Sequence, residues 1–187
     1  MKRYHITGIF GEAENGKTTY MVSHLLTEAT TLEHYDEFYC NLHVQHPRVK
    51  FITYEELRRL KCPTEKGTAK ALVGLDQIHK YIDARRSNSQ QNVDFSQVII
   101  ESRQHGFDLI YTTWMRSVVD KRLRPFTNLY VLAQRGYRGF EYDRIDKDAG
   151  VELPLVRMPW SKAQQVWNKF DTTELIEDET IPTQQSR

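Results

Sequence analysis

Apolar and polar positions along the chain follow two different periods, and the period changes at a glycine-containing loop. Apolar residues recur at every second position over residues 4–10, as in a strand, and the loop at 11–16 follows directly. From Met21 to Ala29, apolar residues recur at helical spacing, which predicts an amphipathic helix with one apolar stripe. A second strand is expected at 38–44.

A short helix is expected to begin after Thr53, because Thr53 and Glu56 have the spacing of a capping box, and Pro63 prevents its continuation. The remaining elements follow from short apolar runs and from helical spacing. They are strands at 71–75 and 109–113, helices from 77 to about 86 and at 96–105, and a hairpin of strands at 129–133 and 140–145. Strands that alternate with helices predict the α/β class, with a mainly parallel sheet flanked by helices and a C-terminal β-hairpin.

Composition divides the chain and restricts its class. Residues 171–187 hold five acidic side chains and one basic, so we expect a single domain at 1–170 and an acidic, flexible tail at 171–187. Over all 187 residues, 26 Lys and Arg stand against 25 Asp and Glu, which excludes binding of nucleic acid by bulk charge but not by a local patch. Two cysteines make neither a disulfide framework nor a zinc site. Because no apolar run approaches the roughly 18 residues of a membrane helix, we expect a cytoplasmic protein without a membrane span.

Eight residues between the first strand and the first helix match the phosphate-binding pattern G-x-x-x-x-G-K-[ST] in full. They are Gly11, Glu12, Ala13, Glu14, Asn15, Gly16, Lys17 and Thr18. The glycines let backbone N–H groups curl around a phosphate without a Cβ in the way. Lys17 can then reach the β- and γ-phosphates, and the Thr18 hydroxyl can ligate Mg²⁺. The match lies between a strand and an amphipathic helix, so it predicts an ATP site, to which we add the next residue, Thr19.

A P-loop also needs a carboxylate on a neighbouring strand to hold the magnesium ion. Asp76 supplies one at the end of the apolar run 71–75, and a second role as helix N-cap is compatible with this. Gln77 follows, where hydrolytic members of this class usually carry a glutamate; an amide orients water but cannot take its proton. The sequence leaves three explanations of Gln77 open. Hydrolysis is slow, or another carboxylate such as Glu101 activates the water, or a natural glutamate has been replaced so that ATP stays bound.

Together these motifs resemble the FtsK–HerA superfamily of DNA-pumping P-loop ATPases, above all the small viral genome-packaging ATPases and the phage assembly proteins similar to zonular occludens toxin. The likeness covers about 4–131 and rests on the segments 11–18, 72–77, 101–106, 109–113 and 119–124. The resemblance implies that strand 109–113 lies between the P-loop strand and the strand ending at Asp76. It also implies a ring, expected to be a hexamer, around double-stranded DNA. Family members often end the middle strand with a polar γ-phosphate sensor, a role that falls on Thr113 or is absent here.

Six basic side chains and one acidic side chain lie between 116 and 138. The resemblance makes Arg122 and Arg124 the candidates for an arginine that reaches the nucleotide of a neighbouring subunit, with Arg85 and Arg86 as alternatives. Other members of this cluster are expected to meet DNA phosphates, and Tyr137 and Phe140 to pack on sugars or bases. A solvated surface with internal ion pairs remains the alternative.

The function predicted from the sequence is an ATP- and Mg²⁺-dependent DNA translocase that packages a viral genome. Its expected location is the host cytoplasm, in association with a capsid, and its expected partners are duplex DNA, further copies of itself, and a procapsid or membrane-vertex protein. Toxin-like relatives carry a membrane helix after the ATPase domain; none is found in this chain, which favours packaging over extrusion. Two alternatives stay open: a nucleotide switch or phage assembly factor with little hydrolysis, which Gln77 favours, and a small P-loop kinase.

Overall fold

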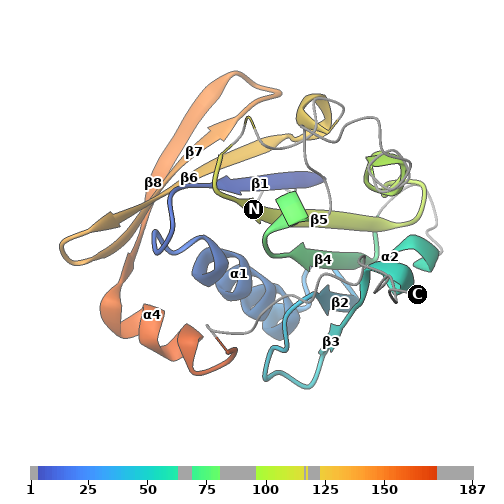
Figure 1. The fold of residues 1–187 in the computed structure, drawn as a ribbon, viewed down its shortest axis with the longest axis horizontal. Coiled ribbons are helices and arrows are strands. Elements are labelled where there is room, and N and C mark those ends of the chain that lie inside the picture. Colours follow the sequence, from blue (N-terminus) through green and yellow to red (C-terminus); the bar gives the residue numbers. More distant parts are fainter. Residues whose placement is uncertain (1–3, 63–68, 81–95, 116, 118–122, 172–187) are drawn as a thin grey trace, which may run out of the picture.

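The computed structural model describes residues 4–62, 69–80, 96–115, 117 and 123–171. These residues form one eight-stranded sheet with helices on both faces (Figure 1). In chain order the strands are β1 (Ile6–Phe10), β2 (Glu37–Cys40), β3 (Val49–Phe51), β4 (Ala71–Leu75), β5 (Phe107–Thr113), β6 (Leu129–Gly136), β7 (Gly139–Asp146) and β8 (Val151–Pro159). The helices are α1 (Lys17–Thr31), α2 (Tyr54–Arg59) and α4 (Trp160–Trp167), with 3-10 turns η1 (Ile78–Lys80) and η4 (Arg124–Phe126).

The strand order is β3-β2-β4-β5-β1-β6-β7-β8, and the pairs from β3 to β6 are parallel while β6, β7 and β8 are antiparallel. Strand β5 lies between β1 and β4, which confirms the order that the family resemblance implied. In register, Thr113 pairs with Phe10, and Tyr111 pairs with Leu75. The carboxyl ends of β1, β4 and β5 therefore meet at one edge of the sheet.

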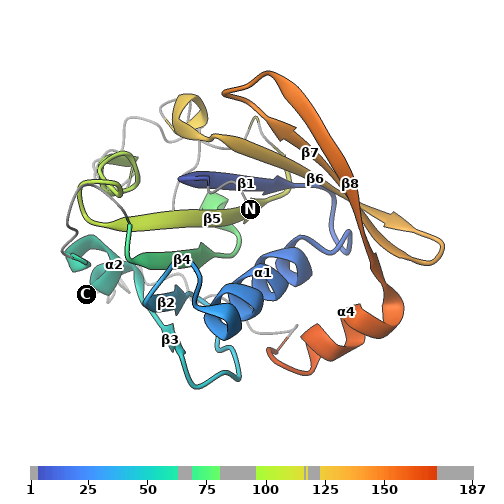
Figure 2. The same ribbon diagram turned by 180° about the vertical axis from the view of Figure 1, so that it is seen from behind.

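Both faces of the central strands are covered. Helix α1 and α4 lie side by side on one face (Figure 2), whereas α2 and the helical residues 96–100 pack on the other. Ile9 and Ile110 belong to the core beneath α1, while Val73 and Leu109 belong to the opposite core. Burial on both sides explains why β1, β4 and β5 are apolar along most of their length.

The predicted α/β class, the P-loop strand and helix, and the hairpin of β6 and β7 are confirmed. The capping box is also present: the Thr53 hydroxyl accepts a hydrogen bond from the Glu56 amide, and the Glu56 carboxylate accepts one from the Thr53 amide. None of the described helices is long and apolar enough to cross a bilayer. The division at residue 171 stays a prediction, since 172–187 lie outside the described residues.

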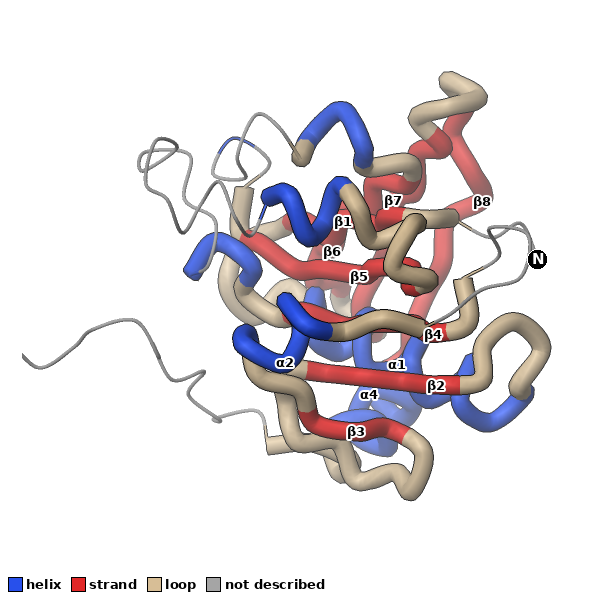
Figure 3. Tube along the Cα trace, turned by 90° about the vertical axis from the view of Figure 1, so that its right-hand side faces the viewer, coloured by secondary structure: helices blue, strands red, loops and turns tan. Residues whose placement is uncertain are grey.

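Several elements differ from the sequence predictions. The helix expected at 96–105 ends at residue 100, and α4 has no counterpart among the predicted elements. The strand expected at 38–44 ends at Cys40, and β3 adds a short strand beside it at the edge of the sheet (Figure 3). The helix expected after Asp76 begins as the 3-10 turn η1, and its continuation to Arg86 falls outside the described residues. Strand β8 was missed because it contains Pro154 and is mostly exposed, a pattern that only an edge strand tolerates.

Candidate nucleotide-binding site

The P-loop connects the carboxyl end of β1 to α1, and its shape depends on glycine at both ends. Gly16 has φ of 80°, and a Cβ there would lie 2.5 Å from the Phe140 ring. Gly11 has φ of 151°, and a Cβ there would lie 2.5 Å from the Ala133 carbonyl oxygen. The Tyr142 hydroxyl donates to the Gly16 carbonyl at 3.1 Å. The loop therefore rests on β6 and β7, which lie more than a hundred residues later in the chain.

Lys17 begins α1 and turns its ammonium group back over the loop. Its Nζ donates to the Glu12 carbonyl at 2.6 Å. Burial lowers the pKa of Lys17 from its ordinary value, and the Asp76 carboxylate opposes that shift. A phosphate group at the loop would favour the charged ammonium in the same way as Asp76 does.

Asp76 follows β4 directly and is buried, with 5% of its surface exposed. Its Oδ1 accepts hydrogen bonds from the Thr18 hydroxyl at 2.8 Å and from the Thr112 hydroxyl at 2.5 Å. Its backbone is held by Asn41, whose amide group donates to the Asp76 carbonyl at 3.0 Å and accepts from the Asp76 N–H at 2.7 Å. Thr18 of α1 and Thr112 of β5 thus meet at the Asp76 carboxylate, while Asn41 after β2 holds its backbone.

The residues at this point fit a magnesium ion. Thr18 and Asp76 present two hard oxygen ligands 2.8 Å apart, the ligand type that Mg²⁺ prefers. The described residues contain no group of three His, Cys, Asp or Glu side chains that could hold a metal on its own, so phosphate oxygens and water would complete the shell. When bound, the ion neutralises charge on the β- and γ-phosphates.

A cavity of about 520 Å³ opens beside the P-loop, within the size range of small-molecule sites. On one side it is bounded by the P-loop, Asp76 and Gln77. The other side is aromatic. Its lining residues are Glu14, Gly16, Lys17, Thr18, Thr19, Leu42, Asp76, Gln77, Arg135, Phe140, Trp160, Trp167, Phe170 and Asp171.

Gln77 and two threonines at the end of β5 surround the expected water-activating position. Gln77 lines the cavity, has φ of 52°, and donates its N–H to the Thr112 hydroxyl at 2.9 Å. Thr112, rather than Thr113, contacts Asp76; the Thr113 hydroxyl lies 3.5 Å from His79. Because side chains alternate along a strand, Thr112 and Thr113 lie on opposite faces of β5. The sensor role of Thr113 stays a prediction.

Glu101 does not belong to this site, which corrects its proposed role as a substitute base. It precedes β5, whose first residue Phe107 pairs with Ala71, the first residue of β4. Glu101 therefore lies toward the amino edge of the sheet, opposite the P-loop edge. There its carboxylate is 3.8 Å from His105.

The structure describes only part of the basic cluster between residues 116 and 138. Arg122 lies outside the described residues, as do Arg85 and Arg86. Arg124 lies in η4, before the amino end of β6, and donates to the Ser117 carbonyl at 2.5 Å. Its backbone lies toward the amino edge of the sheet, but Ser117 lines a cavity together with Gly11, Glu12 and Asn15 of the P-loop. A role of Arg124 toward a neighbouring subunit stays a prediction.

Residues of the β6–β7 hairpin separate into core and surface. Phe140 is 4% exposed and packs under Gly16, so the predicted contact with nucleic acid is wrong for this residue. Tyr137 is 97% exposed at the tip of the hairpin. Arg135 pairs with Glu14 of the P-loop at 3.5 Å, which places a cation at the mouth of the cavity.

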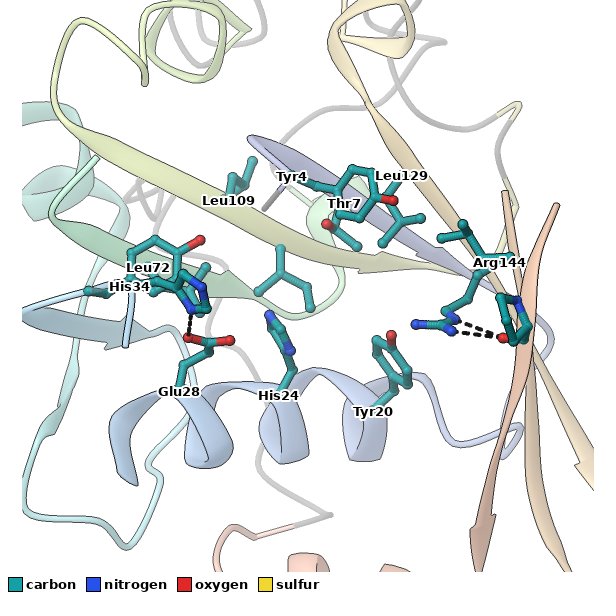
Figure 4. A pocket seen from close by; sticks show the side chains of 14 residues that line it. Tyr4, Thr7, Tyr20, His24, Glu28, His34, Leu72, Leu109, Leu129 and Arg144 are labelled. Carbon is teal, nitrogen blue, oxygen red and sulfur yellow. Dashed lines mark hydrogen bonds and ion pairs between the residues drawn. The ribbon is translucent and has the colours of Figure 1, made fainter. Parts of the chain in front are cut away.

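A second cavity, of about 260 Å³, lies between α1 and the amino half of the sheet (Figure 4). Tyr20, His24 and Glu28 extend from α1 toward it, and His34 pairs with Glu28 at 2.9 Å. Burial lowers the pKa of His24 from its ordinary value; Glu28 raises it and His34 lowers it by smaller amounts. The floor is apolar, so this region is a partly polar pocket distinct from the P-loop cavity.

Sequence reasoning missed several residues of the site, among them Asn41, Thr112, Trp160 and Trp167. Asn41 follows a strand that pairs with β4, and this neighbour relation is visible only in the sheet. Thr112 directly precedes Thr113, the residue that the sequence analysis considered as the γ-phosphate sensor. The two tryptophans lie on α4, which returns to the P-loop from the far end of the chain.

Comparison with known proteins supports the fold. No protein-family model and no curated protein sequence matches this chain. Among solved structures, it is similar to the N-terminal domain of zonular occludens toxin from Neisseria meningitidis, with a TM-score of 0.63 and 16% identity over 91% of this chain and 100% of that chain.

The chain is also similar to the genome packaging NTPase B204 from Sulfolobus turreted icosahedral virus 2. The complex of B204 with sulfate gives a TM-score of 0.61 at 10% identity, over 85% of this chain and 98% of that one. The complex with ATP-gammaS gives 0.60 at 10% identity, over 85% and 99%. At these identities the likeness establishes a shared P-loop NTPase fold, in agreement with the resemblance noted from the motifs.

Proposed function

We propose that this chain is an ATP-hydrolysing DNA translocase and that it serves as the subunit of a viral genome-packaging motor. The observation that carries the proposal is the cluster at the carboxyl edge of the sheet: Asp76 hydrogen-bonded to Thr18, beside Lys17 and facing a cavity of nucleotide size. This is the arrangement that binds a nucleoside triphosphate with Mg²⁺.

Each residue then has a definite task. Backbone N–H groups of the loop and of the first turn of α1 bind the phosphates, and Lys17 exchanges the Glu12 carbonyl for phosphate oxygens. Thr18 and Asp76 hold the ion. Gln77 orients the attacking water by hydrogen bonding and takes no proton.

The translocase part of the proposal is supported by the fold and by charge. The structures of similar fold include a protein named as a genome packaging NTPase. A ring with duplex DNA in its centre would use the basic side chains between 116 and 138 on phosphates, and Arg122 or Arg124 on the neighbour's nucleotide. Association with a capsid in a host cytoplasm follows from the same role.

Steady-state ATP hydrolysis with and without duplex DNA tests the proposal. We expect Mg²⁺-dependent turnover that duplex DNA stimulates. Lys17→Ala should abolish turnover, since the phosphates lose their cationic partner, while its circular dichroism and thermal unfolding stay like those of the wild type. Turnover that DNA leaves unchanged would contradict the translocase, and normal turnover in a folded Lys17→Ala protein would contradict the nucleotide site itself.

A second candidate, a nucleotide-dependent switch, is favoured by Gln77. Among the described residues that line the cavity, the carboxylates are Glu14, Asp76 and Asp171. Asp76 is engaged by two hydroxyls, and Glu14 is paired with Arg135. Tight ATP binding with turnover too slow to measure, with or without DNA, would favour the switch.

A further inference from the structure

The cavity beside the P-loop has two unlike halves, and the P-loop motifs account for only one. The half formed by the loop, Asp76 and Gln77 presents charge and backbone dipoles. The opposite half presents aromatic rings that arrive from β7 and from the end of the chain. We call this second half the aromatic wall. It consists of Phe140, Trp160, Trp167 and Phe170.

The rings of the aromatic wall pack on one another and on the loop. The Phe140 and Trp160 ring centroids are 4.9 Å apart at 73°, and those of Trp160 and Trp167 are 6.4 Å apart. Phe140 is buried beneath Gly16, whereas the two tryptophans keep part of their surface in the cavity. Phe140 packs edge-to-face against both tryptophans, an arrangement that favours fixed ring orientations.

Both indole N–H groups of the wall are already engaged. Trp167 donates to the Thr19 hydroxyl at 2.9 Å, on the first turn of α1, and Trp160 donates to the Tyr137 carbonyl at 3.0 Å. Helix α4 is also anchored by Ala163 and Val166, which are buried in the core it shares with α1. The wall is therefore positioned in advance, and what it offers to the cavity is ring surface.

One cation stands at the edge of the wall. The Arg135 guanidinium carbon lies 5.4 Å from the centroid of Trp160, and the same side chain pairs with Glu14 of the P-loop at 3.5 Å. A guanidinium stacked on an indole extends the flat surface and adds positive charge. Arg135 thus joins the aromatic wall to the phosphate half of the cavity.

We propose that the aromatic wall is the nucleobase subsite of the nucleotide that the P-loop binds, with Trp160 as its main contact. The inference rests on the proposed nucleotide function. A polyphosphate has no apolar surface to place against these rings, whereas a base is a flat aromatic ring that stacks on them. Thr19, hydrogen-bonded to Trp167, directly follows Thr18, so the wall begins where the phosphate site ends.

Recognition by stacking has a consequence for specificity. Every base has a π-face, so a stacking surface tolerates different bases, and edge-reading hydrogen bonds are what separate adenine from guanine. The indole N–H groups of the wall are directed to Thr19 and Tyr137. ATP and GTP should therefore bind with affinities within a few-fold of each other.

Calorimetric titration of three proteins with two ligands tests this subsite. The proteins are the wild type, Trp160→Leu and the control Phe51→Leu, in which the altered ring is 43% exposed on the edge strand β3 and lines neither cavity beside the P-loop. The ligands are MgATP and Mg-tripolyphosphate. In Trp160→Leu we expect ATP affinity to fall about tenfold and tripolyphosphate affinity to stay unchanged. Phe51→Leu should bind both ligands as the wild type does.

Further arms keep the test decisive. Trp160→Phe retains a ring and should bind ATP within a few-fold of the wild type. The wild type should bind ATP at least tenfold more tightly than tripolyphosphate, a measurement that needs no variant. The nucleobase subsite would be overturned if the wild type bound ATP and tripolyphosphate equally well, or if Trp160→Leu kept the wild-type affinity for ATP. Neither result would contradict the proposed ATPase activity. If the wild type bound neither ligand, the nucleotide function would fall together with the subsite.

Discussion

At the scale of single residues, the site depends on how fully Asp76 is engaged before any ligand arrives. Its carboxylate accepts from Thr18 and Thr112, and Asn41 holds its backbone on both sides. The same hydroxyls must exchange partners when an ion and a triphosphate enter, whereas Asn41 is free to stay in place.

Gln77 is the residue that most directly sets the expected rate. Gln77→Glu replaces an amide by a carboxylate of the same size and places a base beside the cavity. General bases contribute about 10²–10⁴-fold, so we expect ATP turnover to rise by a factor within this range. Multiple-turnover phosphate release across pH 6–9 is the measurement; a new dependence on an ionisable group should appear with the rate increase.

Gln104→Glu is the matched control for that variant. Gln104 is exposed and lies near the amino edge of the sheet, so the same change in charge occurs far from the cavity. Its turnover should equal that of the wild type. A Gln77→Glu rate no higher than that of Gln104→Glu would mean that water is activated by another group.

At the scale of elements, the end of β2 acts as a support for the end of β4. Asn41 is 6% exposed and bridges the two strands through both of its polar atoms. At the opposite edge of the sheet, Asn128 has a similar structural role, since its Oδ1 accepts from the Ile6 N–H at 3.0 Å. The two asparagines thus form a natural comparison between the functional edge and the opposite edge.

We expect Asn41→Ala to lower the free energy of unfolding by about 1–3 kcal/mol, because buried backbone groups of Asp76 lose their partners. Asn128→Ala should destabilise the protein as well, since it also removes an acceptor from a backbone N–H. Only Asn41→Ala should reduce ATP turnover, because Asp76 is then less firmly placed. Urea unfolding together with turnover measured well below the transition separates the effects. Equal turnover in the two variants would show that Asn41 is purely structural.

Helix α1 carries a second titratable group whose effect on stability has a definite sign. Because burial lowers the pKa of His24, the folded state binds fewer protons than the unfolded state just below the ordinary value of about 6.5. The stability from neutral His24 is present above that value and is lost as pH falls. His24→Gln should therefore lose less thermal stability between pH 7 and pH 5 than the wild type does.

Several charged and titratable groups face His24, and the control must leave them unchanged. They are Tyr20 and Glu28 on α1, His34 beyond its end, and Arg144 on β7. His43→Gln alters an exposed histidine stacked on Phe51, outside that pocket, and should follow the wild-type pH dependence. A His24→Gln profile that coincides with that of His43→Gln would assign the acid sensitivity to another group.

At the scale of the whole molecule, the nucleotide-binding residues and the backbone of Arg124 lie at opposite edges of one sheet. The P-loop follows the carboxyl end of β1, whereas Arg124 precedes the amino end of β6, the parallel neighbour of β1. The Arg124 guanidinium nevertheless reaches the carbonyl of Ser117, which lines a cavity together with Gly11, Glu12 and Asn15 of the P-loop. A ring in which each subunit completes the next one's site is the arrangement that would use such an arginine.

Mixing two inactive variants tests this arrangement. Lys17→Ala lacks a working P-loop, and Arg122→Ala or Arg124→Ala lacks the candidate arginine. The arginine variant should lose turnover but keep ATP affinity within a few-fold, since such a group acts mainly on transition-state charge. A mixture should recover part of the wild-type turnover, because some interfaces combine an intact P-loop with an intact arginine. No recovery with either arginine variant, together with specific activity that is unchanged on dilution, would contradict the shared site.

Sequence alone determined the features that depend on neighbours along the chain. The P-loop, the capping box at Thr53, and the apolar run ending at Asp76 are local patterns, because turn geometry, helix capping and burial of a whole strand each restrict residue types within a few positions. The position of β5 between β1 and β4 also followed, although through resemblance to a family and not from the periodicity. The structure bears out this fold.

Tertiary structure decided what reaches the site from a distance. Whether Thr112 or Thr113 faces Asp76 depends on the register of β5, since a shift of one residue reverses every side chain of a strand. Asn41 reaches Asp76 only because β2 pairs with β4. The tryptophans of α4 arrive beside Thr19 through a strand, β8, whose prolines and exposure conceal it in the sequence. These contacts are made between segments whose separation along the chain leaves no periodic trace, so packing alone could reveal them.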